Sequence, residues 1–300
     1  MMEMTYHKPV LLTQSVSGLS IKPASVYVDA TFGGGGHSKE ILTQMDNQSK
    51  LFAFDQDEDA QQNTLDDTRF TLIPHNFKHL KRFLRFHKIT HVDGILADLG
   101  VSSHQFDTPS RGFSIRYDGP LDMRMNQQQP LSASDIINSY SEADLAALFF
   151  NFGELRNANK IAQHIVSTRG THIDTTTQLN EVLTPFLPQG NENKILAKIY
   201  QALRMEVNKE IEVLKDFLMQ CKEVLCPGGR LSVISYHSLE DRLVKRLIQN
   251  GNFDTEPYKD DFGKPELYFR KKGGLETPSS EEIKQNNRAR SAKLRIAERL

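Results

Sequence analysis

The sequence has little cysteine, no long apolar run and no excess of charge of either sign. Its two cysteines, Cys221 and Cys226, lack C-x-x-C spacing, so we expect reduced thiols near the core with no chemical role. No run of about 18 apolar residues occurs, which predicts no membrane span. Residues 1–8 lack a basic start followed by an apolar stretch, so we expect no secretion signal and a cytoplasmic protein.

Two common ligand motifs are also missing. Asp55 opens a segment that resembles a calcium loop, but Ala60 replaces the glycine at its sixth position and Asp66 the glutamate at its twelfth. We therefore expect no metal. The glycines that begin at Gly33 are not followed by a Gly-Lys pair, which excludes a phosphate-binding P-loop.

The most informative feature that is present is a run of four glycines, from Gly33 to Gly36, between an apolar strand and a helix. Glycines let the backbone approach a ligand closely, and the helix start offers free N–H groups. A second strand ends at Asp55, about 20 residues further on, where nucleotide-binding folds place an acid against a ribose. The pair predicts a nucleotide-type cofactor.

Spacing leaves two cofactor classes open. A dinucleotide fingerprint would put its third glycine at Ser38, which is an imperfect substitute. An S-adenosylmethionine fold begins with an acid on the first strand and glycines at alternate positions after it, and Asp29 fits with one departure, Thr31. A nicotinamide dehydrogenase therefore stays the first rival interpretation.

The order of apolar runs predicts an α/β fold with a helical insertion. We expect parallel strands near 26–30, 51–55, 70–74 and 92–98, then helices only, then strands at 230–235 and 292–298. The pattern over 193–226 predicts one long or broken helix that ends at Pro227-Gly-Gly229. Residues 252–290 are polar and poorly patterned, which predicts a partly mobile segment. The division is 1–105 and 206–300 for the sheet domain and 106–205 for the insertion.

Candidate reacting groups follow two strands. Asp98 ends the fourth strand, where open α/β sheets place their reacting residues, and Ser102 and Ser103 follow it in a loop. We expect Asp98, helped by one of these serines, to orient a substrate. His237 follows the fifth strand and has two interpretations, a proton acceptor or a helix cap together with Ser238; the cap is slightly favoured.

Positive charge collects at the carboxyl end. From Lys264 onward, ten Lys and Arg side chains accompany five Glu. Such a segment suits phosphate contacts, and an ordinary solvated end explains it equally well.

Six motifs in this order match one known family: Thr31-Phe-Gly-Gly-Gly-Gly-His-Ser38, Asp98-Leu-Gly-Val-Ser-Ser103, Arg111-Gly-Phe-Ser, Asp118-Gly-Pro-Leu-Asp-Met-Arg-Met125, Ser235-Tyr-His-Ser-Leu-Glu-Asp-Arg242 and Arg288-Ala-Arg-Ser-Ala-Lys-Leu-Arg295. The chain resembles the RsmH (MraW) family from His7 to Arg299. The resemblance implies a Rossmann-like class I S-adenosylmethionine-dependent methyltransferase sheet with an inserted all-helical domain. It also implies methylation of the N4 amine of a cytidine in the decoding region of 16S rRNA, within the small ribosomal subunit.

The resemblance also assigns roles to single residues. The implied cofactor contacts are Gly35, Gly36, His37, Asp55, Phe77, Asp98 and Gln105. The candidate rRNA contacts are Phe113, Tyr117, Asp122, Arg124, Arg288 and Arg290. The two aromatic rings could stack on an extruded base or anchor their loop, and Asp122 with Arg124 could instead form a structural salt bridge. A second rival is a non-catalytic rRNA assembly factor. No oligomeric state follows from the sequence.

Overall fold

The computed structural model describes residues 9–300; residues 1–8, on which the expectation of no secretion signal depends, lie outside the described residues, as does His7 of the resemblance. The chain folds as two compact units. One runs to Gly100 and resumes at Ile211, and the other spans Val101–Glu210. We call them the sheet unit and the insertion. No helix within residues 9–300 has the length and apolar character needed to cross a membrane.

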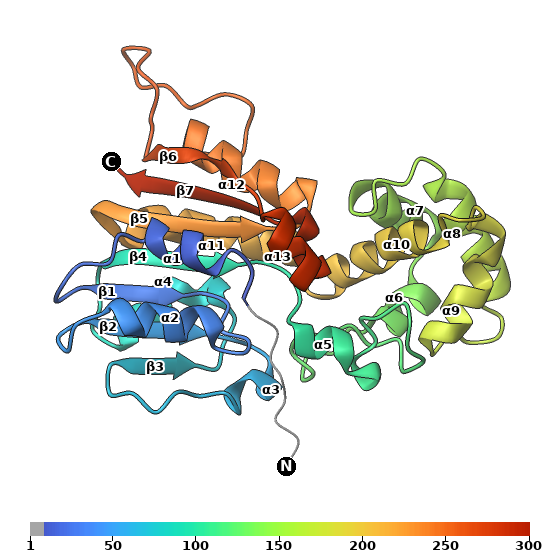
Figure 1. The fold of residues 1–300 in the computed structure, drawn as a ribbon. Coiled ribbons are helices and arrows are strands. Elements are labelled where there is room, and N and C mark those ends of the chain that lie inside the picture. Colours follow the sequence, from blue (N-terminus) through green and yellow to red (C-terminus); the bar gives the residue numbers. More distant parts are fainter. Residues whose placement is uncertain (1–8) are drawn as a thin grey trace. The chain divides into compact units, whose positions relative to one another are not determined.

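The sheet unit contains one seven-stranded sheet in the order β3-β2-β1-β4-β5-β7-β6 (Figure 1). Its strands are β1 (Val26–Asp29), β2 (Lys50–Phe54), β3 (Phe70–Ile73), β4 (Val92–Asp98), β5 (Leu225–Ser235), β6 (Phe269–Glu276) and β7 (Lys293–Arg299). The first five are parallel, and β7 is antiparallel to β5 and β6. Adjacent residues of β1 enter different cores, Tyr27 on one face and Val28 on the other. Burial of both faces is typical of an α/β sheet, so the expected Rossmann-like fold is confirmed.

Helices supply the cores on the two faces of this sheet. They are α1 (Leu12–Gly18), α2 (Gly36–Gln44), α3 (Glu58–Gln61), α4 (Leu80–Phe86), α11 (Glu210–Val224), α12 (Ser238–Asn250) and α13 (Ser280–Gln285), with the 3-10 turns η1 (Phe77–His79) and η4 (Asn287–Ser291). Val16 of α1 and Ile41 of α2 join the core around Tyr27. Leu80 of α4, Phe217 of α11 and Leu247 of α12 join the core around Val28.

The insertion has a core of its own, and its named elements are all helices, joined by loops that include one isolated β-bridge between Pro120 and Thr175. Its helices are α5 (Ser103–Asp107), α6 (Ala133–Ser139), α7 (Glu142–Asn151), α8 (Ala158–Thr168), α9 (Thr176–Leu183) and α10 (Glu192–Val207), with the 3-10 turns η2 (Pro109–Arg111) and η3 (Thr184–Phe186). Ile136, Phe149, Ile161 and Leu203 come from four of these helices and are fully buried together. This separate core is why the insertion behaves as one unit.

Of the two alternatives for 193–226, one long helix or a broken one, the structure has the broken one. α10 ends at Val207 and α11 begins at Glu210, because Lys209 has a left-handed backbone (φ 50°) and the buried Asn208 amide donates to the Met123 carbonyl oxygen at 2.8 Å. The expected stop at residues 227–229 is wrong, since these residues lie inside β5.

The segment 252–290 contains regular structure that its composition did not predict. β6 pairs with β7 as the edge strand of the sheet, and α13 begins with Ser279, whose hydroxyl accepts the Glu282 N–H at 3.1 Å. β6 is largely exposed and so lacks the apolar alternation that identifies a half-buried strand.

Candidate functional site

The sheet register brings the ends of four parallel strands to one edge. Asp29 of β1 is in register with Ala53 of β2 and with Leu96 of β4, and Asp98 of β4 is in register with Ile234 of β5. Because β2 and β4 flank β1 on opposite sides, the connections from β1 and β4 leave this edge in different directions. Open α/β sheets bind their ligands at such a switch point.

The glycine turn leads from β1 into α2. Gly33 and Gly35 have positive φ angles of 50° and 74°, which a residue with a side chain rarely adopts. A Cβ atom on Gly36, the first residue of α2, would lie 2.1 Å from Cγ of Pro9. The turn therefore needs glycine both for its backbone conformation and for its packing.

The two departures from a glycine fingerprint have structural roles. The Thr31 hydroxyl accepts the Asp98 N–H at 2.7 Å, which joins the turn after β1 to the end of β4. The Ser38 hydroxyl donates to Asp29 Oδ2 at 2.7 Å, and Asp29 Oδ1 accepts the Thr31 N–H at 3.1 Å. Burial raises the pKa of Asp29, while the charge of His37 and these hydrogen bonds lower it. Asp29 therefore stabilises the turn through the hydrogen bonds that its two carboxylate oxygens accept.

Asp55 lies beside the same turn. Its Oδ2 accepts the Gly33 N–H at 2.8 Å, and its Oδ1 accepts the Asp57 N–H at 2.9 Å. Desolvation raises the pKa of Asp55 to about 6, against the opposing effect of these two N–H groups. Each oxygen keeps a second lone pair, so this carboxylate can accept hydrogen bonds from the hydroxyl groups of a ribose.

Side chains from two other segments lie beside the Asp98 carboxylate at the end of β4. The Tyr236 hydroxyl donates to its Oδ1 at 2.8 Å, and His37 Nδ1 lies 3.9 Å from its Oδ2. The Asp98 side chain is 22% exposed. Desolvation raises its pKa to about 6, although His37 and the Tyr236 hydrogen bond act to lower it. A carboxyl group with this pKa can accept a proton near neutral pH.

Two further predicted cofactor residues have partners inside the protein. His37 is buried, and its Nε2 lies 3.2 Å from the carbonyl oxygen of Val10, so only its backbone is available to a ligand at the turn. Phe77 begins η1, and its ring packs edge-on against Phe217 with 4.9 Å between the ring centres. Phe77 is only partly buried, so part of its ring can contact a ligand.

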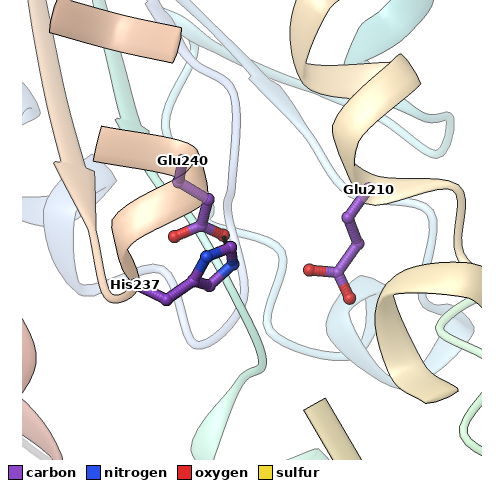
Figure 2. A group of neighbouring side chains, drawn as sticks. All are labelled: Glu210, His237 and Glu240. Carbon is purple, nitrogen blue, oxygen red and sulfur yellow. Dashed lines mark ion pairs between the residues drawn. The ribbon is translucent and has the colours of Figure 1, made fainter. Parts of the chain in front are cut away.

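His237 precedes α12 but does not cap it. Its side chain accepts no helix N–H, so the favoured cap interpretation is wrong. Figure 2 shows the imidazole beside Glu240, with 3.1 Å between Nε2 and Oε1. The alignment is poor, and neither ring nitrogen makes a hydrogen bond of standard geometry within residues 9–300. Glu240 also accepts the Tyr236 N–H at 2.9 Å. Glu210, which the figure also labels, belongs to the insertion, where it pairs with Arg204.

Within the insertion, Ser102 and Gln105 form a capping box at the start of α5. The Ser102 hydroxyl accepts the Gln105 N–H at 3.2 Å, and the Gln105 side-chain oxygen accepts the Ser102 N–H at 3.1 Å. Gln105 is buried, whereas Ser103, the first residue of the helix, is partly exposed. This geometry gives Ser102 and Gln105 a structural role and leaves the Ser103 hydroxyl the more accessible.

The two candidate stacking rings of the insertion differ in exposure. Phe113 is 3% exposed within the insertion core, beneath the Arg111 guanidinium, so its ring presents no face to a base. Tyr117 is 49% exposed. Only Tyr117 remains a candidate for stacking.

Asp122 and Arg124 form the salt bridge that was the competing interpretation. Arg124 donates from Nε to Asp122 Oδ1 at 2.9 Å and from Nη2 to Oδ2 at 2.7 Å, and its Nη1 donates to the Gln129 carbonyl oxygen at 2.8 Å. These bonds fix the loop before α6, so neither side chain is poised for a ligand.

At the carboxyl end, η4 presents Arg288 and Arg290 to solvent on either side of the buried Ala289. η4 precedes β7, whose first residue, Lys293, pairs with Ser235 at the end of β5. The two exposed arginines therefore lie toward the same sheet edge as Asp98. Two other cations of this segment form ion pairs, Arg295 with Asp241 at 2.6 Å and Lys272 with Glu298 at 2.9 Å.

Sequence reasoning missed the role of Tyr236 and of Glu240 at this edge. Both lie within the Ser235–Arg242 motif, which drew attention only to His237. No sequence signal identified this role, because it depends on the strand register: Tyr236 follows Ile234 by two residues, and Ile234 lies opposite Asp98.

Comparison with known proteins gives one family over nearly the whole chain. The model of the MraW methylase family matches residues 4–300. The Ribosomal RNA small subunit methyltransferase H of Christiangramia forsetii is 60% identical over 301 residues, covering all of both chains. The protein of that name from Flavobacterium johnsoniae is 61% identical over 298 residues, 99% of each chain. Among solved structures, a putative rRNA methylase from Clostridium thermocellum aligns with 97% of this chain and 98% of its own at 14% identity, with a TM-score of 0.44.

Proposed function

The chain belongs to the MraW methylase family, and from this premise we propose that it transfers a methyl group from S-adenosylmethionine to the N4 amine of a cytidine in the decoding region of 16S rRNA, in the cytoplasm during maturation of the small ribosomal subunit. The observation that carries the proposal is Asp98, a carboxylate with a pKa raised to about 6, beside the glycine turn at the switch point of the sheet. The names of the relatives support the rRNA substrate.

The residues at this edge fit S-adenosylmethionine. We assign the amino-acid end of the cofactor to the N–H groups at the start of α2, beside Gly35 and Gly36, and its ribose to Asp55, which lies beside the same turn. Phe77 offers an apolar surface beyond β3. We propose that three further residues contact the cofactor: His37 through its backbone, Asp98 through its carboxylate, and Gln105 from the capped first turn of α5.

The protein contributes position and electrostatics to the transfer. When bound, S-adenosylmethionine supplies a methyl group already activated by its sulfonium. The N4 lone pair of cytosine is delocalised into the ring, so a carboxylate that accepts an N4 proton increases the electron density on nitrogen. Asp98 is that acceptor, and holding amine and methyl in line contributes roughly 7 to 11 kcal/mol.

The remaining predicted residues assist in this scheme. We assign the substrate contact to Ser103, and Ser102 caps its helix. The His237 ring, beside Glu240, is a second proton acceptor. Tyr117 stacks on the extruded base, and Arg288 and Arg290 contact rRNA phosphates. We assign rRNA recognition to the insertion, residues 106–205 of the sequence-based division.

The decisive experiment uses small ribosomal subunits from a deletion strain. Incubation with the protein and S-adenosylmethionine, followed by mass spectrometry of 16S rRNA nucleosides, is expected to restore N4-methylcytidine that the deletion strain lacks. Unchanged N4-methylcytidine in the deletion strain would favour a non-catalytic assembly factor. Thermal stabilisation by NAD and not by S-adenosylmethionine would favour a dehydrogenase.

The cofactor site has its own test in Asp55→Asn. The amide keeps one acceptor oxygen but loses the charge, so we expect binding of S-adenosylmethionine, measured by calorimetry, to weaken about tenfold or more. Asp67→Asn is the matched control, because Asp67 pairs with Arg69 before β3 at the opposite edge of the sheet. Equal affinities of the two variants would contradict the assignment of Asp55.

A further inference from the structure

Tyr236 hydrogen-bonds to the Asp98 carboxylate, and the proposed function gives it no role. It is the first residue after β5, and its hydroxyl donates to Asp98 Oδ1 at 2.8 Å. The inference drawn from this bond rests on the proposed function, because it concerns how Asp98 accepts the substrate proton.

The position of Tyr236 is determined by the sheet and by the start of α12. Asp98 lies opposite Ile234, and residues two apart on a strand point to the same face, so Tyr236 extends beside Asp98. Its backbone N–H donates to Glu240 Oε2 at 2.9 Å, and its ring packs against a small core that contains Val10 and Leu294. Both ends of the residue are therefore fixed before any substrate binds.

This bond makes the two oxygens of Asp98 unequal. Oδ1 is occupied by the Tyr236 hydroxyl, whereas Oδ2 lies 3.9 Å from the His37 ring nitrogen, which is too long for a hydrogen bond. We propose that Tyr236 is a positioning residue for methyl transfer: its hydroxyl holds Asp98 in the rotamer in which Oδ2 faces the N4 amine of the substrate. Without it, the carboxylate can rotate and present either oxygen, or neither.

The charged groups around Asp98 determine how removal of the Tyr236 hydroxyl changes the pKa of Asp98. Burial, Asp29 of β1 and Glu240 of α12 raise the pKa of Asp98, whereas His37 of α2 and the Tyr236 hydrogen bond lower it. Burial and the nearby carboxylates, Asp98, Glu240 and Glu282 of α13, keep the Tyr236 hydroxyl protonated as a donor by raising its pKa. Loss of the hydroxyl therefore raises the pKa of Asp98.

The test is the pH profile of Tyr236→Phe with small subunits as substrate. Asp98 must be ionised to accept the proton, so the rate rises with pH through its pKa. We expect this acid limb to move up by about one pH unit, with a rate about fivefold lower at pH 6 and a smaller loss at pH 8.5. KM for S-adenosylmethionine should change by less than about twofold, because only one hydroxyl is removed. An unmoved acid limb would overturn the proposal.

A second variant should shift the acid limb of the pH profile in the opposite direction. Incorporation of 3-fluorotyrosine at position 236 makes the hydroxyl more acidic and a stronger donor, so the acid limb should move to lower pH. A residue that serves only as packing would shift the limb in neither variant. If the fluorinated protein keeps the wild-type midpoint, the hydroxyl does not act on Asp98.

The matched control is Tyr27→Phe. Tyr27 is buried in the same sheet, and its hydroxyl accepts the Lys22 N–H at 2.7 Å, away from the carboxyl ends of the strands. We expect its acid limb to stay at the wild-type pH. A shift equal to that of Tyr236→Phe would mean that any lost tyrosine hydroxyl produces the effect, which would overturn the proposal.

A measurement without rRNA separates this inference from the proposed function. The carboxyl carbon of Asp98, assigned in carbon-13 NMR spectra by comparison with Asp98→Asn, is titrated in the wild type and in Tyr236→Phe. A higher midpoint in the variant supports the positioning role even if methyl transfer to 16S rRNA fails. Equal midpoints overturn the role even if the enzyme methylates its rRNA.

Discussion

The ionised forms of two carboxyl groups at the functional edge, Asp55 and Asp98, lower the stability of the folded protein. Desolvation raises the pKa of Asp55 and of Asp98 to about 6, above the value of about 3.9 for an unfolded aspartate. The folded state therefore binds a proton more tightly than the unfolded state between these two values. As a result, each group costs stability progressively as pH rises from about 4 to about 6, and the full cost remains above that range.

Asp98→Asn should separate function from stability. The neutral amide does not bear the desolvation cost of a charge, so we expect the free energy of unfolding at pH 8 to increase by about 1 to 3 kcal/mol, while methyl transfer is lost. The gain should disappear near pH 4, where wild-type Asp98 is itself neutral. Urea unfolding at several pH values measures this, and wild-type activity in the variant would contradict the role of Asp98.

Asp241→Asn is the control, and we expect it to change the free energy of unfolding in the opposite direction. Although burial raises it, the hydrogen bond and charge of Arg295 bring the pKa of Asp241 below its usual value. The ionised side chain thus stabilises the fold above about pH 4, and this contribution is lost as pH falls through the folded-state pKa. The variant should be less stable than the wild type at pH 8, and the difference should shrink in acid.

Single residues were predictable where a motif required them. The glycine turn, Asp55 and Asp98 follow directly from strand ends and spacing. For Phe113 the sequence left base stacking and loop anchoring open, because the pattern around a loop aromatic does not distinguish a solvent-facing ring from a buried one, and here the ring is buried. Tyr236 could not be assigned because its partner, Asp98, is 138 residues away in sequence.

At the scale of elements, α5, α6, α7 and α9 of the insertion begin with a side-chain cap, whereas α8 and α10 do not. α5 and α6 both begin with a capping box, formed by Ser102 with Gln105 and by Ser132 with Asp135. Such caps typically contribute about 1 kcal/mol. A comparison of the two capping boxes therefore separates the contribution of Ser102 to stability from any contribution to catalysis.

We expect Ser102→Ala and Ser132→Ala each to lower the free energy of unfolding by about 1 kcal/mol. Methyl transfer at saturating S-adenosylmethionine should fall in Ser102→Ala and stay near the wild-type rate in Ser132→Ala, because only α5 carries Ser103. Denaturant unfolding and initial rates provide both measurements. If both variants kept the wild-type rate, neither Ser102 nor the start of α5 would contribute to the reaction.

The boundaries of some helices and strands could not be predicted from the hydrophobic pattern of the sequence alone. The parallel strands were predictable because they are apolar and buried on both faces. The break between α10 and α11 was not, because it contains neither glycine nor proline and depends on the buried amide of Asn208. β6 was missed because an exposed edge strand gains its stability from backbone pairing with β7, which leaves no apolar pattern.

At the scale of the whole molecule, the net charge of −1 conceals an uneven distribution. Arg295 and Lys272 form ion pairs, with Asp241 and Glu298. Arg288 and Arg290 are exposed and lie toward the edge that carries Asp98. We therefore expect binding to rRNA to depend on salt concentration.

The double variant Arg288→Gln/Arg290→Gln should weaken binding to small subunits and reduce its salt dependence. We expect the slope of log affinity against log salt to fall by about one for each rRNA phosphate that the variant no longer neutralises. Filter binding between about 50 and about 300 mM salt measures this. Arg85→Gln/Lys88→Gln removes the same charge at the opposite edge of the sheet, where both side chains are exposed, and should retain the wild-type slope. Identical slopes in the two double variants would exclude the η4 arginines from the interface.

The sequence by itself determined the α/β class, the helical insertion and the family, and it located Asp55 and Asp98 at the ends of strands, because strand periodicity, glycine spacing and ordered motifs are local properties of the chain. Only the tertiary structure decided how these residues act together. The register of β4 against β5 pairs Tyr236 with Asp98, and packing commits Phe113, Asp122 and Arg124 to the insertion. Such assignments depend on contacts between distant segments and on burial, neither of which a local pattern contains.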